Sequence, residues 1–405
     1  MPPTMTGRPR SDGLSRCSTD AKNASRSRCM IVAVDRMAPV SRARRPRLHA
    51  HPRPGSRVST VAEREADRRL PGGQRGGMTQ TPSIYTAHDI PDLLNALPTL
   101  FGFRPAESLV AVATHGPRRR FGFRLRVDIP AGEDVQTLAR VVVGHLRHQG
   151  AEGAIVLAVT RQQEVARDLL AAIERELDQI DVIVCARADG ERYWSDEPGF
   201  PVAGIAYESS DHHLSIVQAV AAGQQILPDR DALVQRYRAV EQPRRAWMDR
   251  TTAEVLDEVV RVVSRTPDED LAEVGMGQVQ PILARGLAGE RLTDDDLARL
   301  SIWVSGIAVR DQVWSQITTE TADGMLRVLA EVSRSVVPPF EPGVLSLTAF
   351  AAWLTGDGTQ SLIAVERALA ADPAYSMAGL MLQMLEGGVP PSQWSAIRAV
   401  GPASA

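Results

Sequence analysis

Ala154-Ile-Val-Leu-Ala-Val159 is the stretch of this 405-residue chain that decides its fold class. Six consecutive apolar residues between Gly153 and Thr160 predict a buried strand. An amphipathic segment over 133–149 precedes it, and a second helical segment over 162–178 leads to another buried strand, Asp181-Val-Ile-Val-Cys-Ala186. Together with the half-exposed strand over 121–129, this order predicts two right-handed crossovers and a parallel sheet core.

Two hairpins extend the predicted sheet. The apolar run over 108–114 is joined to the strand over 121–129 by His115-Gly-Pro-Arg-Arg-Arg120. Asp189-Gly190 is typical of a type I′ turn and leads to a short strand over 191–194. The sheet is therefore expected to be mixed. Before it, Asp89 is typical of a helix N-cap, and the short helix is expected to end at Leu97 because Pro98 disfavours continuation.

From about residue 210 onward the apolar pattern is helical. Thr293 followed by three aspartates predicts the start of one helix over 294–316. Residues 349–373 resemble one tetratricopeptide unit. A peptide-binding groove built from such repeats needs about three units, so we expect an antiparallel helix pair instead. We predict a mixed, partly parallel α/β domain over 78–228 and an all-helical C-terminal domain over 229–405 ending in this TPR-like helix pair.

Residues 1–77 differ in character from the rest of the chain. They contain 16 Arg and one Lys against six acidic residues, and no Phe, Trp or Tyr. Such a segment cannot bury enough apolar surface to offset the entropy of ordering its backbone. We interpret it as a disordered Arg-rich extension produced by a misassigned start codon, with Met78 as the true start. A basic arm that binds nucleic acid is the alternative.

The composition of residues 78–405 excludes several kinds of chemistry. No lysine follows Lys22, so neither a Walker phosphate loop nor a Schiff base is available. Cys185 is the only cysteine after residue 77, which excludes an internal disulfide and agrees with a reducing cytoplasm. No apolar run approaches the roughly 18 to 20 residues that span a bilayer. A net charge of −14 opposes binding to nucleic acid. We expect no cofactor, no metal and no membrane association.

Several motifs carry a resemblance to a known family. They are Leu93-Leu-Asn-Ala-Leu-Pro-Thr-Leu-Phe-Gly-Phe-Arg-Pro-Ala-Glu-Ser-Leu-Val110, Arg126-Val-Asp-Ile-Pro130, Ala219-Val-Ala-Ala-Gly223 with Leu227-Pro-Asp-Arg-Asp231, the hairpin over 350–373 and Gly388-Val-Pro390. In order and spacing the chain resembles the actinobacterial domain of unknown function 4192 family from Met78 to its C-terminus. The resemblance implies no activity, substrate or cofactor. Many relatives have a cysteine cluster where residues 195–205 of this chain have none, so a metal or redox role is not carried over.

Most groups that suggest chemistry also have a structural explanation. His145 and His148 share a helix face, as metal ligands do, but His145 lies on the stripe expected to pack on the sheet. Ser209-Ser-Asp-His-His213 contains the residue types of a nucleophilic triad, but Ser and Asp before a helix are typical caps. Cys185 is expected to be buried and inert, and Asp294, Asp295 and Asp296 to complement a helix dipole.

Weak binding motifs are interpreted in the same way. Arg118-Arg119-Arg120 and Arg244-Arg245 are expected to be solvated charges of a turn and a helix end. Gly275-Met-Gly277 is only a fragment of a dinucleotide fingerprint, because a third glycine and a preceding strand are missing, and is expected to be a loop.

Arg126 and Asp128 remain as the best candidate site. They occupy alternate positions near the end of a strand, with Arg104, Glu107 and Ser108 expected nearby. Ligands of open α/β sheets gather beyond the carboxyl ends of strands, although an ion pair that fixes the strand to the first loop is the alternative.

We therefore expect a cytoplasmic, non-catalytic scaffold or binding protein for an unknown protein or small polar ligand. The alternative is an enzyme of unknown class in which Arg126, Asp128 and Ser108 are the candidate catalytic residues. A deep pocket with convergent ionisable groups would favour the enzyme, and a flat apolar patch would favour the binding protein.

Overall fold

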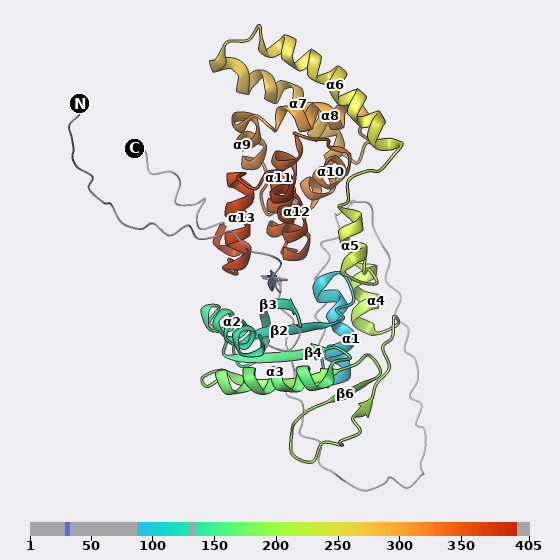
Figure 1. Ribbon diagram of the computed structural model, residues 1–405, viewed down its shortest axis with the longest axis vertical. Coiled ribbons are helices and arrows are strands. Elements are labelled where there is room, and N and C mark those ends of the chain that lie inside the picture. Colours follow the sequence, from blue (N-terminus) through green and yellow to red (C-terminus); the bar gives the residue numbers. More distant parts are fainter. Residues whose placement is uncertain (1–28, 33–86, 130–133, 395–405) are drawn as a thin grey trace, which may run out of the picture.

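A seven-stranded mixed sheet forms the N-terminal half of the protein (Figure 1). The computed structural model describes residues 29–32, 87–129 and 134–394. In spatial order the strands are β1 (Cys29–Val32), β3 (Arg120–Asp128), β2 (Ser108–His115), β4 (Gly153–Val159), β5 (Asp181–Ala188), β6 (Arg192–Trp194) and β7 (Ile205–Ala206). This confirms the predicted mixed, partly parallel sheet.

The parallel part of the sheet is smaller than predicted. β2 pairs antiparallel with both β3 and β4, so β3 and β4 run in the same direction but are not hydrogen-bonded to each other. Only β4 and β5 form a parallel ladder. The strand–helix–strand connections exist as expected, but the prediction of a parallel core was wrong, because the hairpin inserts β2 between β3 and β4.

Helices α2 (Val135–His148) and α3 (Gln163–Glu176) cover one face of the sheet. Alternate strand residues such as Leu109, Leu125 and Val156 pack against them. Val110 and Ile155, which point to the opposite face, belong to a second core that includes α1 (Ile90–Phe101) and the helices of the C-terminal half. Both faces of the central strands are therefore buried, as their continuous apolar runs predict.

The first helix is longer than its sequence suggests. Asp89 caps α1 as predicted, its Oδ1 accepting the backbone N–H of Asp92 at 2.8 Å. The helix does not end at Leu97: it includes Pro98 and continues to Phe101, which is buried. It ends at Gly102, whose φ of 75° is the left-handed conformation that glycine favours. Packing of the last turn therefore overrides the local preference of the residue before proline.

The C-terminal half is helical, as predicted. Its helices are α4 (Leu214–Ala221), α5 (Arg230–Arg236), α6 (Arg244–Val263), the 3-10 helix Asp268–Asp270, α7 (Leu271–Leu287), α8 (Asp294–Trp303), α9 (Ile307–Ser315), α10 (Ala322–Ser335), α11 (Glu341–Leu354), α12 (Gly358–Ala371) and α13 (Ser376–Glu386). The single helix expected over 294–316 is two helices, because the chain turns at residues 304–306. In the TPR-like pair α11 and α12, Ser361 and Ala368 are fully buried, as expected of small residues between close helices.

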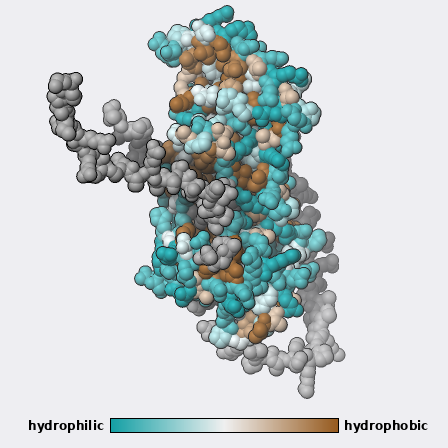
Figure 2. Space-filling model, viewed as in Figure 1, coloured by the Kyte–Doolittle hydropathy of each residue, from teal (hydrophilic) through white to brown (hydrophobic). Residues whose placement is uncertain are grey.

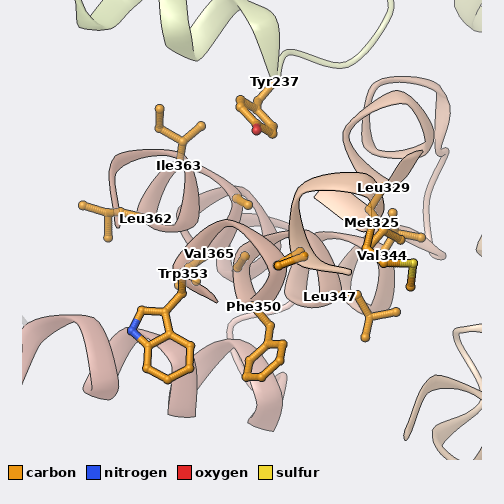
Figure 3. Close-up of a cluster of buried hydrophobic side chains, with 14 of the residues drawn as sticks. Tyr237, Met325, Leu329, Val344, Leu347, Phe350, Trp353, Leu362, Ile363 and Val365 are labelled. Carbon is orange, nitrogen blue, oxygen red and sulfur yellow. The ribbon is translucent and has the colours of Figure 1, made fainter. Parts of the chain in front are cut away.

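One continuous core joins the sheet to the helices. In Figure 3, Phe350 and Trp353 lie side by side, and Tyr237, which follows α5, reaches the cluster from another segment. Tyr237 is 1% exposed, and its hydroxyl donates to Oε1 of Gln360 on α12. Figure 2 shows apolar residues on the surface where α6 meets α7, and Val260 and Val263 are among the exposed side chains of α6.

Most of the predicted Arg-rich extension lies outside the described residues, and so does Met78. Within it, Cys29–Val32 form β1, which pairs antiparallel with β3 and contacts α12 and α13. For these four residues the prediction of disorder was wrong. Their short apolar run supplies a strand that completes part of an exposed sheet edge.

Candidate functional site

Arg126, Asp128 and Ser108 lie together, as the sequence suggested. Arg126 Nε donates to Ser108 Oγ at 2.8 Å, and Arg126 Nη2 lies 2.6 Å from Asp128 Oδ1. The guanidinium carbon is 5.8 Å from the centre of the Phe103 ring. Arg126 is 4% exposed, whereas the side chain of Asp128 is 49% exposed. The Ser108 hydroxyl donates to the carbonyl of Ala106, so it is engaged both as donor and as acceptor.

The surroundings of Arg126 are those of a structural ion pair. Burial lowers the pKa of Arg126, and the charge of Asp128 opposes that shift. Arg230 and Asp231, at the start of α5, also act on this guanidinium. Arg126 thus joins β3 to β2 and lies near the first turn of α5, and it lines neither the cavity beside Glu107 nor the one beside α4.

Glu107 points away from this pair, toward the end of β4. Its backbone φ of 46° is unusual for a residue with a side chain. Its carboxylate accepts from the Thr160 hydroxyl, from the backbone N–H of Arg161 at 3.2 Å and from Gln162 Nε2 at 3.3 Å. Burial raises the pKa of Glu107, but these hydrogen bonds outweigh it and the pKa lies below its usual range.

A cavity of about 260 Å³ opens beside Glu107 at the carboxyl ends of the parallel strands. β4 ends at Val159 and β5 at Ala188, and the backbone N–H of Thr160 donates to the Ala188 carbonyl at 2.8 Å. Ligands of open α/β sheets bind at this position. The wall includes charges of both signs together with apolar side chains: Leu94, Leu97, Pro98, Arg104, Pro105, Ala106, Glu107, Val159, Thr160, Arg161, Asp189, Gly190, Tyr207 and Ser209.

Arg104 separates this cavity from a larger one of about 620 Å³. The larger cavity is lined by the segment 223–228 and by Ile216 and Val220 of α4. Arg104 forms an ion pair with Asp211, whose side chain is 79% exposed, and Arg104 Nη1 lies 3.4 Å from Ser209 Oγ. Because Asp211 is solvated, a bound anion can replace it at low cost.

A triad-like arrangement joins α1 and α4. His213 Nδ1 lies 2.8 Å from Ser215 Oγ, and His213 Nε2 lies 3.3 Å from Asp92 Oδ1. Ser215 is 5% exposed, and none of the three residues lines a described cavity. We therefore interpret the arrangement as a bridge between two helix starts. The sequence could not reveal it, because Asp92 is remote in the chain from the other two.

The capping role predicted for the segment before α4 is replaced by other contacts. His213 occupies the N-cap position without a side-chain cap, and Ser209 and Asp211 interact with Arg104. Further along the chain, Thr293 and Asp296 form a capping box at the predicted start of α8. Asp294 accepts from Arg244 Nη1 at 2.6 Å and from Trp247 Nε1 at 2.7 Å, which ties α8 to α6.

The remaining motifs have structural explanations. Burial lowers the pKa of His145 and raises the pKa of the Cys185 thiol. The prediction that Gly275-Met-Gly277 forms a loop was wrong: it lies within α7, where Gly275 is buried. A β-carbon at Gly275 would lie 2.5 Å from Val309 Cγ2 and 2.7 Å from Trp303 Cε3, so this glycine allows close helix packing.

Among the described residues, no group of three or more His, Cys, Asp or Glu side chains is arranged to hold a metal ion. No helix in the same part of the chain is long and apolar enough to cross a membrane.

The sequence pointed to Arg104 and Glu107 but not to the opposite wall of the small cavity. Thr160 comes directly after one predicted strand and Asp189 three residues after the end of another, which is the signal that could have identified them. Tyr207 has no such signal, because it reaches the cavity from the loop after β7.

Comparison with known proteins places the chain in a family. The family model of the domain of unknown function DUF4192 matches residues 91–392, so the chain belongs to this family. No curated protein and no solved structure matches it. The match includes the residues of the small cavity but gives them no role.

Proposed function

We propose that this member of the DUF4192 family is a non-catalytic binding protein for a small polar ligand. The observation that carries the proposal is the cavity at the carboxyl ends of β4 and β5, where Arg104 and Arg161 lie with Glu107 and Asp189. Guanidinium groups bind carboxylates and carboxylates bind ammonium groups through charge-assisted hydrogen bonds. The apolar part of the wall can hold an aliphatic group. These features fit a small zwitterion such as an apolar amino acid.

The chemistry of the wall supports binding rather than turnover. The lowered pKa of Glu107 keeps its carboxylate ionised near neutral pH, whereas a general acid or base works best with a pKa near the working pH. The residues that line this cavity include no histidine, cysteine or lysine.

An enzyme is the second candidate. The convergence of four ionisable side chains on one cavity is the feature that favours it. That cavity is not at the site first expected for an enzyme, because Arg126 and Asp128 do not line it. Arg126 and Ser108 are also occupied by each other and by their neighbours. An enzyme of this family would therefore use the groups around Glu107.

Thermal unfolding of the full chain with each of the twenty common amino acids tests the proposal. A ligand at 100 times its Kd stabilises the folded state by about 2.7 kcal/mol, which is a measurable rise in Tm. We expect the rise from at least one apolar amino acid, and its loss in Arg104→Gln and in Glu107→Gln. Arg118→Gln, in the exposed turn between β2 and β3, is the matched control. No rise with any amino acid, or a rise that persists in both cavity variants, contradicts the proposal.

A cytoplasmic location and an actinobacterial source are also part of the proposal. The single cysteine after residue 77 and the near absence of lysine in an Arg-rich chain support them. Fractionation of the native host, with the protein followed by antibody, tests the location.

A further inference from the structure

The outer edge of β3 is only partly paired. β3 has nine residues, and β1 pairs with four of them, from Cys29 opposite Val127 to Val32 opposite Arg124. Within the described residues no strand pairs with the outer edge of Arg120–Phe123. Unpaired backbone groups at a sheet edge are a template for another strand.

The space beside this edge, between β3 on one side and α12 and α13 on the other, is called the slot here. β1 contacts α12 and α13 of the C-terminal half as well as β3. A hydrogen bond also joins the two parts of the protein that flank β1: Gln149 Nε2 of the turn after α2 donates to the Gly388 carbonyl after α13 at 2.7 Å. An added strand is therefore held on one side by β3 and on another by helices, an arrangement used by domains that bind extended peptides.

Arg124 gives the slot a chemical preference. Its Nε is buried and has no hydrogen-bond partner, and Asp357, at the start of α12, is the nearby opposite charge. A buried donor without a partner is costly. The register places Val32 at the position opposite Arg124. A strand with a hydrogen-bond acceptor at that position would satisfy the guanidinium.

We propose that this slot binds an extended, largely apolar strand of another polypeptide, with a hydrogen-bond acceptor opposite Arg124. Cys29–Val32 is an intramolecular occupant that competes with this partner strand. Residues 33–89 separate β1 from α1 in the chain, and the effective concentration of a tethered segment falls with linker length. A four-residue ladder on such a tether can therefore be displaced. The proposal is independent of the small-ligand cavity.

Fluorescence anisotropy with labelled peptides tests the slot in the full chain under reducing conditions. One peptide has the sequence of residues 27–34, Ser-Arg-Cys-Met-Ile-Val-Ala-Val, and the other has Thr in place of Val32. The double variant Met30→Pro, Ile31→Pro removes the one N–H of these two residues that faces β3 and fixes φ at both positions, which breaks the ladder and frees the edge. The double variant Ser56→Pro, Arg57→Pro is the matched control, with two prolines elsewhere before Met78.

We expect the Met30→Pro, Ile31→Pro variant to bind both peptides at least tenfold more tightly than the unmodified chain and the control. The Thr peptide should bind roughly tenfold more tightly than the Val peptide, because it satisfies Arg124. Adding Arg124→Met should abolish this preference while leaving binding of the Val peptide.

Far-ultraviolet circular dichroism establishes that each variant is folded. A folded Met30→Pro, Ile31→Pro variant that binds neither peptide overturns the proposal, because the edge then serves only the strand of its own chain. Equal affinity of all the variants also overturns it, since the peptides would then bind elsewhere. Equal affinity for the two peptides refutes the role of Arg124.

Discussion

At the scale of single residues, environment separates side chains that look equivalent in the sequence. Glu107 and Ser108 are neighbours, yet Glu107 accepts hydrogen bonds at the end of β4 and Ser108 pairs with Arg126 on β3. The positive φ of Glu107 turns the chain between these two positions. One residue therefore borders a cavity while the next belongs to a buried ion pair.

The lowered pKa of Glu107 predicts a pH-dependent effect of Glu107→Gln. A lowered folded-state pKa adds stability above the unfolded value of about 4.3, and this stability is lost as pH falls through the folded pKa. We expect the variant to be less stable at pH 7 by a few tenths of a kcal/mol to about 1 kcal/mol, because the group is exposed. Melting curves from pH 3 to 7 should show the difference shrinking below about pH 4.3. Glu290→Gln, in the exposed loop after α7, is the control, and a difference that grows in acid contradicts the assignment.

Asp128→Asn distinguishes a structural ion pair from a ligand site. The substitution leaves Arg126 buried without its counter-charge, which costs 3 to 5 kcal/mol for a fully buried pair. Because Asp128 is half exposed, we expect about 1 to 2 kcal/mol by urea unfolding, with unchanged ligand affinity. Asp178→Asn, from an exposed pair with Arg147, should cost less than about 1 kcal/mol. Lost ligand affinity at unchanged stability would instead assign Asp128 to a binding site.

At the scale of elements, helix starts are joined to distant parts of the chain. The first turn of α8 is tied to α6 by Asp294, and the starts of α1 and α4 are bridged by His213. The backbone N–H of Thr293 makes a local contact instead. It donates to Asp296 Oδ2 at 2.9 Å within the capping box. Local capping and tertiary contact therefore act on the same turn of α8.

Thr293→Ala should destabilise the protein by about 1 kcal/mol. The substitution removes the side-chain acceptor for the backbone N–H of Asp296. Urea unfolding followed by circular dichroism measures the change. Thr319→Ala, whose exposed hydroxyl donates to the neighbouring exposed Glu320 at 2.9 Å, is the control and should be close to neutral. Equal effects of the two substitutions would show that the cap contributes nothing.

At the scale of the whole molecule, the sheet and the helices share a core. Tyr237 belongs to this core, and its hydroxyl donates to Gln360. Arg367 Nη1 donates to the Tyr237 carbonyl at 2.8 Å, and Arg367 Nη2 donates to Glu341 Oε1 at 3.0 Å. These polar contacts join the end of α5 to α11 and α12 within the helical half. The shared apolar core and the hydrogen bond from Gln149 Nε2 to the Gly388 carbonyl join the sheet to the helices, so we expect the halves to unfold together.

Tyr237→Ala tests this coupling. Removing a large, fully buried aromatic side chain costs about 3 to 5 kcal/mol. Five of the six tryptophans lie in the helical half, so their fluorescence reports on it, whereas circular dichroism reports on the whole chain. We expect one coincident transition by both methods, shifted to lower urea in the variant. Two separate transitions in the unmodified chain would show that the halves fold independently.

The sequence by itself determined the elements whose signals are local. The apolar runs of β4 and β5, the cap of α1 and the start of α8 after Thr293 were all predicted, because burial period and helix-start signals depend on neighbouring residues. The charged residues of the small cavity were found only in part, since Arg104 and Glu107 were noted while Asp189 served only as a turn signal.

Only the tertiary structure decided which elements lie together. The insertion of β2 between β3 and β4, the continuation of α1 through Pro98 and the burial of Gly275 within α7 depend on partners distant in the chain. The same holds for β1, since four apolar residues in an Arg-rich segment become a strand only where a sheet edge is free. Contacts between remote residues leave no periodic signal, because their energy depends on packing in the folded chain and not on sequence spacing.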